Sequence, residues 1–302
     1  MRKLIRRVCL LFAVVVFLPA LYPIGLLAGD AAEAGAGLSA EEEAAIAEGR
    51  ASFEIVSWDE SWTYASNSMI HASDVKLYHA ADGCGIVICV NAGHGTSGGE
   101  SVQTLSHPDG TGKVTGGTNA EGAVYSMAVS SGTTFLDGSA ERDANLQIAM
   151  ILKEKLLAAG YDVLMIRESE DVQLDNIART CFANRYADAH LALHYDSTDY
   201  DKGFFYMGVP SAESYRSMPP VSEFWRWHES LGEALVKAVS ESGLKVYESG
   251  RMEMDLTQTS YSTVPSLDIE LGDRASDHSY AVQEQLADAL VKGLNDFFAD
   301  RR

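Results

Sequence analysis

Basic residues are scarce in this sequence. Its 302 residues include 23 lysines and arginines but 43 aspartates and glutamates, which gives a formal net charge of −20 at pH 7. Binding to the phosphates of a nucleic acid requires positive charge on the protein. We therefore expect no nucleic-acid partner. The excess of acidic side chains is instead typical of a soluble protein surface.

Cysteine is scarce as well. One of the four cysteines, Cys9, lies in an N-terminal leader, which leaves Cys84, Cys89 and Cys181. Cys84 and Cys89 bracket a predicted strand and would lie about 16 Å apart along it. A disulfide needs Cα atoms within about 7 Å of each other. The sequence therefore implies no disulfide framework, and we expect none of these thiols to bind a metal.

The N-terminus has the pattern of an export signal. Residues 2–7 carry four basic side chains and residues 8–28 carry no charge. We predict that residues 1–29 are a signal peptide or a membrane anchor. Small residues at 32–36 suit cleavage, whereas the length of the apolar run suits an anchor. The protein is then secreted or extracytoplasmic, and an uncleaved leader would tether it to the outer face of the cytoplasmic membrane.

Two segments separate the leader from the main domain. Residues 30–50 are rich in alanine and glycine and then contain Ser39-Ala40-Glu41-Glu42, the spacing of a helix capping box. This segment is predicted to be a tether and a short helix. Residues 51–84 are rich in serine, tryptophan and tyrosine without clear periodicity, and we predict an N-terminal extension that packs on the main domain.

Strand patterns alternate with helical patterns over residues 85–302, without internal repeats. Apolar runs predict strands, and apolar spacing predicts helices; the strands cover 86–90, 161–166, 189–194, 203–208 and 266–269, and the helices cover 141–159, 172–187, 221–242 and about 276–298. This order predicts an α/β fold: a single domain with a mostly parallel twisted sheet flanked by helices on both faces. Functional sites in such folds gather at the carboxyl ends of the strands.

Four side chains lie at the ends of these elements. His94 in Gly93-His94-Gly95 follows the first strand, Glu141 begins a helix, His194 ends a strand, and Glu270 ends a buried strand. Two imidazoles and one carboxylate form a three-ligand zinc set with an open fourth position. A further carboxylate can act as a base. These residues are typical of a metallohydrolase.

The order of these motifs resembles one enzyme family. Gly93-His94-Gly95, Glu141 with Asn145-Leu146, Arg179 with Ala183-Asn184, His194 and Glu270 together resemble the zinc-dependent N-acetylmuramoyl-L-alanine amidases, which cut bacterial peptidoglycan. The resemblance implies a zinc amidase catalytic domain over residues 85–302, with His94, Glu141 and His194 as zinc ligands and Glu270 as the catalytic base. It also implies autolysin-like activity on peptidoglycan or muropeptides.

The sequence departs from the family pattern at two places. Asn91 stands where the family usually has aspartate, so a carboxylate near the first histidine is missing. After Glu270-Leu271-Gly272 the family tends to have an aromatic residue and then asparagine, whereas this chain has Asp273-Arg274-Ala275-Ser276. The resemblance therefore leaves the wall beside the base undefined.

Three of the four candidates have a rival nearby. His190 shares a strand face with His194 but would lie about 13 Å away, so we expect it to be an interior histidine. Glu100 is the rival of Glu141. Asp268 alternates with Glu270 on one strand face, and we assign it a structural role. Among the histidines outside the motifs, three are predicted to be exposed to solvent: His107, His228 and His278.

The long segment between the first two candidates is irregular. Residues 96–140 are rich in glycine, serine and threonine, and a loop this long in a compact domain is either functional or disordered. We expect it to be a mobile cover over the cleft.

Two other functions use the same residues. One is zinc-dependent hydrolysis of another cell-wall bond, by a peptidase or a deacetylase. The other is non-catalytic binding of peptidoglycan, for which a ligand or the base would be lost. All four positions are occupied by suitable side chains here, which favours an enzyme.

Overall fold

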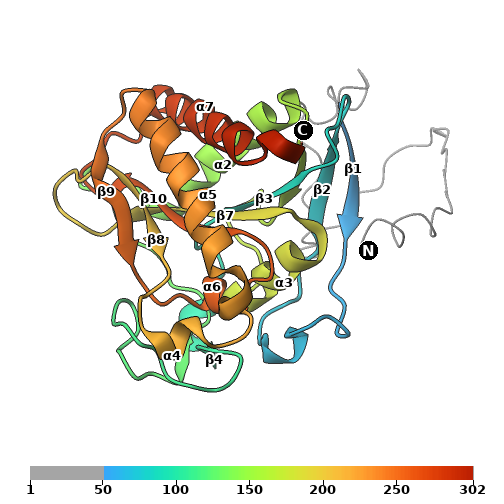
Figure 1. Ribbon diagram of the computed structural model, residues 1–302, viewed down its shortest axis with the longest axis vertical. Coiled ribbons are helices and arrows are strands. Elements are labelled where there is room, and N and C mark those ends of the chain that lie inside the picture. The colour runs from blue at the N-terminus through green and yellow to red at the C-terminus, as the bar shows by residue number, and fades with distance from the viewer. Residues whose placement is uncertain (1–50, 302) are drawn as a thin grey trace, which may run out of the picture. The chain divides into compact units, whose positions relative to one another are not determined.

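A computed structural model describes residues 51–301 of the chain (Figure 1). The predicted leader and tether, residues 1–50, lie outside the described residues. Between residues 51 and 301, none of the helices is both long enough and apolar enough to span a bilayer.

A central sheet of eight strands organises the domain, in the order β1-β2-β6-β3-β7-β10-β8-β9 (Figure 1). The strands are β1 (Ala51–Val56), β2 (Val75–Ala80), β3 (Val87–Ala92), β6 (Asp162–Met165), β7 (Ala189–Asp196), β8 (Phe204–Gly208), β9 (Val246–Glu253) and β10 (Ser266–Asp273). The four central strands β6, β3, β7 and β10 are parallel. Antiparallel β2 and β8 flank them. The predicted mostly parallel sheet is confirmed.

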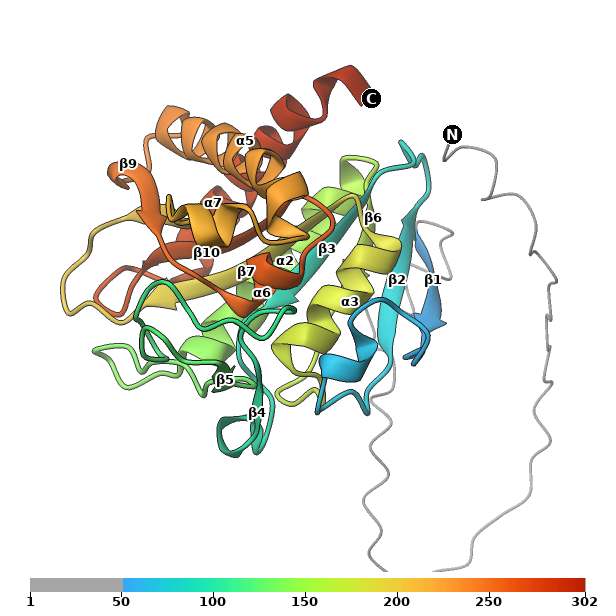
Figure 2. The ribbon, with the colours of Figure 1, turned by 60° about the horizontal axis from the view of Figure 1, so that its bottom comes forward.

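Helices cover both faces of this sheet (Figure 2). One face packs against α2 (Glu141–Ala158), α5 (Val221–Glu241) and α7 (Tyr280–Phe297), and the other against α3 (Asn176–Tyr186). Strand β3 shows the alternation that makes this two-sided packing: Ile88 and Val90 join the first core, and Val87 and Cys89 join the second. The short helices α4 (Glu213–Arg216) and α6 (Thr257–Tyr261) complete the domain.

The extension predicted over residues 51–84 contributes two strands to the sheet. Strand β2 pairs with β6, and β1 pairs with β2 at the edge. Between these strands, Trp58 and Trp62 pack on Phe182 of α3, with ring centroids 5.9 and 5.0 Å apart. The aromatic residues that lack periodicity in the sequence are thus a loop that covers α3.

Helix α3 begins four residues later than the pattern predicts. Its N-cap is Asp175, whose Oδ1 accepts a hydrogen bond from the backbone N–H of Ala178 (2.8 Å). The other oxygen, Oδ2, accepts from the backbone N–H groups of Met69 and Ile70 at 2.6 and 2.9 Å. One carboxylate therefore ends the preceding loop and joins the extension to α3.

The three cysteines within residues 51–301 are free thiols, as predicted. Burial raises the pKa of the Cys181 thiol to about 12, which keeps it protonated at neutral pH.

The predicted exposure of three histidines is wrong. His107 and His228 are each only 1% exposed, and His278 is half-buried on Phe135, with ring centroids 3.8 Å apart. His228 lies on the inner side of α5, where its Nδ1 accepts a hydrogen bond from the backbone N–H of Ser266 (2.9 Å). Contacts between distant elements, which have no local pattern, bury these rings.

Two buried histidines make the fold sensitive to acid. Burial lowers the pKa of both His190 and His228 to about 3, so both rings stay neutral in the folded protein. The unfolded chain binds these protons as pH falls below about 6.5, and stability is lost between there and the folded pKa. At about pH 4.5, each ring is expected to lower the free energy of unfolding by about 2–3 kcal/mol relative to neutral pH.

Urea unfolding at neutral and acid pH checks this prediction. His228→Asn keeps an acceptor for Ser266 but has no imidazole to titrate. We expect the loss of unfolding free energy between about pH 7.5 and about pH 4.5 to be about 2–3 kcal/mol smaller in this variant. An equal loss in the two proteins would show that His228 does not contribute.

Candidate functional site

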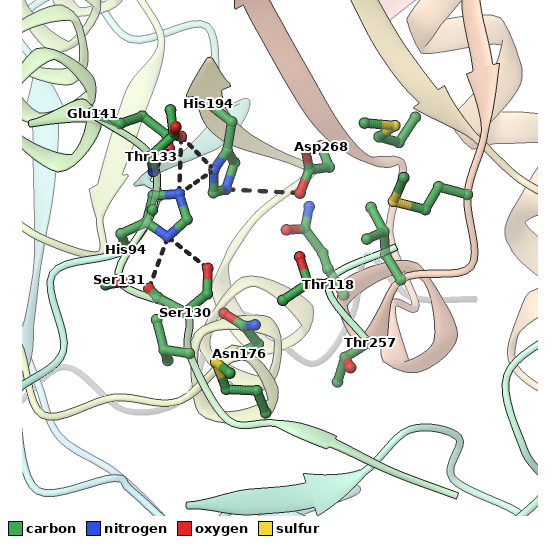
Figure 3. Close-up of a pocket in the computed structure, with 18 of the residues that line it drawn as sticks. His94, Thr118, Ser130, Ser131, Thr133, Glu141, Asn176, His194, Thr257 and Asp268 are labelled. Atoms are coloured by element: carbon green, nitrogen blue, oxygen red, sulfur yellow. Dashed lines mark hydrogen bonds and ion pairs between the residues drawn. The ribbon is translucent and has the colours of Figure 1, made fainter. Parts of the chain in front are cut away.

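The four candidate side chains line one cavity of about 530 Å³. Figure 3 shows three of them there: His94, Glu141 and His194. His94, His194 and Glu270 reach it from the carboxyl ends of β3, β7 and β10, and Glu141 reaches it from the first turn of α2. The expectation that parallel strands bring these distant positions to one edge is met.

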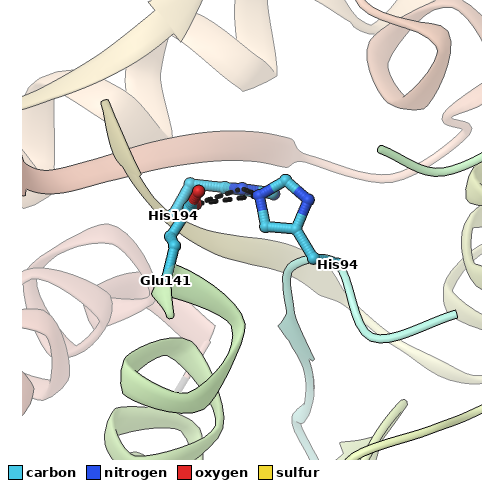
Figure 4. A group of neighbouring side chains, drawn as sticks. All are labelled: His94, Glu141 and His194. Carbon is cyan, nitrogen blue, oxygen red and sulfur yellow. Dashed lines mark hydrogen bonds and ion pairs between the residues drawn. The ribbon is translucent and has the colours of Figure 1, made fainter. Parts of the chain in front are cut away.

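Three ligand-type atoms converge at one point (Figure 4). His94 Nε2 lies 2.9 Å from Glu141 Oε1 and 3.0 Å from His194 Nδ1, and the last two atoms lie 3.2 Å apart. Among the described residues, this group of histidine and acidic side chains is the one with the geometry to hold a metal ion. The rival Glu100 lines the same cavity but does not join the group.

The first histidine lies in a strained turn that two buried arginines stabilise. His94 has a left-handed backbone with φ 64°, which is unfavourable for a residue with a side chain. Arg179 of α3 donates to the carbonyls of His94 (2.7 Å) and Ala92 (3.2 Å). It also donates to Asn91 Oδ1 at 3.0 Å. Asn91 is thus a neutral acceptor for Arg179.

Arg167 is the second of these arginines, and the sequence analysis missed it. It follows β6 and donates to the carbonyls of Gly93 (3.0 Å) and Ala92 (3.3 Å). Its one sequence signal is a charged residue directly after an apolar strand. Burial lowers the pKa of Arg167 to about 10 and that of Arg179 to about 9, so both remain cationic at neutral pH.

Hydrogen bonding determines which nitrogen of His94 is available to a metal. Nδ1 lies 2.8 Å from the carbonyl oxygen of Ser130, and a carbonyl can only accept. Nδ1 therefore carries the proton, and the lone pair of Nε2 points at Glu141 and His194 (Figure 3).

Glu141 is oriented by three donors around its carboxylate. The backbone N–H of Thr133 donates to Oε2 (2.7 Å), while the backbone N–H of Tyr195 (3.1 Å) and the amide of Asn145 (3.2 Å) donate to Oε1. Burial alone would raise the pKa of Glu141, but the neighbouring imidazoles of His194 and His94 outweigh it and lower the pKa. The spacing from Glu141 to Asn145 thus has a structural cause, a contact across one helical turn.

His194 packs directly on the backbone of Gly93. A Cβ atom at Gly93 would lie 2.1 Å from Cε1 of His194, closer than van der Waals contact allows. Gly93 therefore has to be glycine because the second imidazole occupies that space.

We expect Gly93→Ala to displace His194 and to weaken zinc binding about 10-fold or more, because ligand orientation determines affinity. Gly83→Ala is the matched control, since its added Cβ would meet its nearest atoms at 3.5 Å. Competition with a chromogenic zinc chelator measures both variants. Wild-type affinity in Gly93→Ala would mean that the turn adjusts without moving the imidazole.

Two carboxylates of β10 face the cavity beside the histidines. Glu270 is 7% exposed, and its Oε2 has no hydrogen-bond partner among residues 51–301. Burial, and then the neighbouring charges of Asp268 and Glu141, raise its pKa well above the usual range. Asp268 Oδ2 lies 3.7 Å from His194 Nε2. Burial raises the pKa of Asp268 as well, although His194 opposes this shift.

Charged side chains lie beyond Glu270, near the end of β10. Asp273 is fully buried, and its Oδ2 accepts hydrogen bonds from the backbone N–H groups of Lys202 (2.6 Å) and Gly203 (3.3 Å). The Lys202 ammonium contacts Asp196, which lines the cavity. Ion pairs thus connect the end of β10 to the side chain of Asp196.

The long loop of residues 96–140 forms the opposite wall. It contains a small hairpin of β4 (Gln103–Leu105) and β5 (Tyr125–Met127), and several of its residues line the cavity. His107 Nε2 lies 2.9 Å from Asp255 Oδ2, which also accepts from the backbone N–H of Val114 (2.7 Å). Buried contacts thus join the loop to the segment after β9, and its mobility stays a prediction.

His190 and Asn184 both lie away from the converging atoms. His190 is fully buried beneath the site, and the amide of Asn91 donates to its Nε2 (3.2 Å). Asn184 contacts the backbone of Tyr261 and Thr263 at 2.8 and 2.7 Å, away from the three converging atoms. Its role is structural.

The donor set fits a zinc-type cation. Two imidazole nitrogens and one carboxylate oxygen are the ligands of many zinc sites with an open position. Lone pairs directed at one point repel one another unless a cation lies among them. The tautomer of His94 and the orientation of Glu141 both direct a lone pair to that point.

Comparisons with solved structures show that the fold is shared with amidases. The N-acetylmuramyl-L-alanine amidase Ami1 from Mycobacterium smegmatis is similar with a TM-score of 0.60 at 17% identity, covering 72% of this chain and 98% of that chain. Apo Ami1 from Mycobacterium abscessus is similar with a TM-score of 0.55 at 19% identity, covering 71% of this chain and 99% of that chain. The amidase AmiC2 of Nostoc punctiforme is similar with a TM-score of 0.50 at 17% identity, covering 71% of this chain and 97% of that chain.

Sequence comparison identifies the family. A search of curated proteins finds no match. The family profile Amidase_3, described as N-acetylmuramoyl-L-alanine amidase, matches residues 88–296. This range includes all four candidate side chains and covers most of the chain. The chain therefore belongs to the Amidase_3 family of N-acetylmuramoyl-L-alanine amidases.

Proposed function

We propose that this protein is a zinc-dependent hydrolase of the amide bond between N-acetylmuramic acid and L-alanine in bacterial peptidoglycan. The observation that carries the proposal is the convergence of His94, Glu141 and His194 beside Glu270, in a chain of the amidase family. We propose the three converging residues as zinc ligands and Glu270 as the catalytic residue.

Zinc bound there would supply a Lewis acid that polarises the scissile carbonyl and makes water a stronger nucleophile at neutral pH. Glu270 takes a proton from the attacking water and transfers it to the amine of the leaving L-alanine as the C–N bond breaks. The products are the free lactyl carboxylic acid and the stem peptide. The burial that raises the pKa of Glu270 also makes it a stronger base toward water.

The remaining residues of the site orient these groups. Arg179 and Arg167 stabilise the turn that carries His94. Thr133 and Asn145 orient Glu141. The loop of residues 96–140 and the wall at Asp196 leave a cleft between them for a peptide or glycan strand.

Mass spectrometry of the products tests this function directly. Purified peptidoglycan is incubated with the protein, with and without a zinc chelator. We expect free stem peptides that begin with L-alanine, and their release should stop with chelator and return with added zinc. Shortened stem peptides would indicate a peptidase, loss of acetyl groups a deacetylase, and unchanged material a binding protein.

We also propose that the protein acts outside the cytoplasm, where its substrate lies. The support is the basic and apolar pattern of residues 1–29. Fractionation of cells that make the full chain would place it in the medium, in the membrane or in the cytoplasm, and the last result would contradict the proposal.

A further inference from the structure

The two histidines of the site differ in what contacts the nitrogen away from the metal position. His94 presents Nε2 to that position, and its Nδ1–H donates to the Ser130 carbonyl at 2.8 Å. His194 presents Nδ1 instead, 3.0 Å from His94 Nε2. For Nδ1 to offer a lone pair, the proton of neutral His194 has to be on Nε2.

Asp268 is the carboxylate that Nε2 of His194 faces. Its Oδ2 lies 3.7 Å from that nitrogen (Figure 3), and His194 is its one ionic partner in the described part of the chain. Asp268 is only 16% exposed on a strand whose neighbours Leu267 and Ile269 are fully buried. A carboxylate in such surroundings lowers stability unless a partner compensates for its burial.

We propose that Asp268 is a positioning residue that selects the Nε2–H tautomer of His194, orients the ring and strengthens its Nδ1 as a metal ligand. This inference rests on the proposed function, because it assigns a role toward the zinc that His194 would bind. It replaces the purely structural role that the sequence suggests for Asp268. Metal-binding histidines commonly donate their second N–H to a carboxylate, and loss of that partner weakens metal affinity.

The two carboxylates of β10 then have separate roles. Asp268 and Glu270 lie on the same face of the strand, two residues apart. Asp268 has His194 as its partner, whereas Glu270 Oε2 has no hydrogen-bond partner among residues 51–301. The paired carboxylate positions a ligand, and the unpaired one remains available to water.

Two substitutions separate the charge of Asp268 from its volume. Asp268→Asn keeps an acceptor oxygen but removes the charge, and Asp268→Leu removes both while keeping a similar size. Glu270→Gln is the matched control, because it removes one charge from the same strand face without changing the partner of His194. The wild type and the three variants are made as the full chain.

Zinc affinity is measured by competition with a chromogenic chelator, and the unfolding temperature is measured on the metal-free proteins. We expect affinity to fall about 10- to 100-fold in Asp268→Leu, less in Asp268→Asn, and least in Glu270→Gln. The metal-free unfolding temperature of Asp268→Leu should be unchanged or higher, because a buried carboxylate is lost.

Three results would overturn the inference. One is wild-type zinc affinity in both Asp268 variants. Another is an equal loss in Glu270→Gln, which would mean that any nearby charge has the same effect. The third is a fall in affinity that only accompanies a fall in the metal-free unfolding temperature, as a structural role predicts. If the wild-type chain itself bound no zinc, the proposed function would fail at its metal, which is a distinguishable result.

Discussion

Replacing Glu270 with glutamine is expected to lower kcat for amide hydrolysis by a factor on the order of 100 or more, because a general base commonly contributes that much. Glutamine has nearly the same shape but cannot accept the proton of the attacking water. Glu270 is almost fully buried and its Oε2 lacks a hydrogen-bond partner within residues 51–301, so the substitution breaks no contact of that oxygen. The fold and the bound zinc should both be retained.

Steady-state kinetics with a defined muropeptide, in buffer saturated with zinc, measures this effect. A fall in kcat with little change in KM is the signature of a group that acts in the transition state. Asp268→Asn is the comparison, because excess zinc compensates for weaker affinity and most of its turnover should survive. If Asp268→Asn abolished turnover while Glu270→Gln did not, the base would be the other carboxylate.

The central part of the fold is predictable because its signals are local. Strand β3 is buried on both faces, and its residues 87–90 appear in the sequence as a continuous apolar run. Strands β7 and β10 are also largely buried, and apolar residues separate their polar ones. Helix α2 ends where Gly160 follows it, with φ 86°. Such elements need no knowledge of their neighbours to be recognised.

The edges of the sheet are not predictable in this way. Strand β9 is half-exposed along most of its length and contains Glu248 with a φ of 45°. An edge strand of this kind lacks an apolar run in the sequence. It forms a strand because it pairs with β8. Strands β1 and β2 are not predicted either. Their place depends on pairing, because β2 pairs with β6 and β1 pairs with β2.

The site also has a predictable part and an unpredictable part. The converging residues His94, Glu141 and His194 can be named from motifs, because the metal-binding chemistry restricts their residue types. The groups that orient them cannot. The acceptor for His94 is a backbone carbonyl, which has no sequence signal, and the partner of His194 depends on the register between β7 and β10. His107 and Asp255 form a buried pair 148 residues apart, which only the folded chain reveals.

The second large effect is expected from His194→Ala, which should abolish stable zinc binding while His190→Ala retains it. Both residues lie on the same face of β7, but only His194 reaches the cavity, where its Nδ1 lies 3.0 Å from His94 Nε2. His190 is fully buried four residues earlier and hydrogen-bonds Asn91. Its loss should lower stability, since it leaves an unfilled space in the core.

Metal analysis of the desalted proteins distinguishes the two histidines. The wild type and His190→Ala should each carry about one zinc per chain, and His194→Ala close to none, because a zinc site of this type needs three protein ligands. Unfolding curves run in parallel confirm that His194→Ala is folded, so that its missing zinc reflects a lost ligand. Equal loss of zinc in both variants would refute the assignment of His194, because it would mean that either substitution disrupts β7 as a whole.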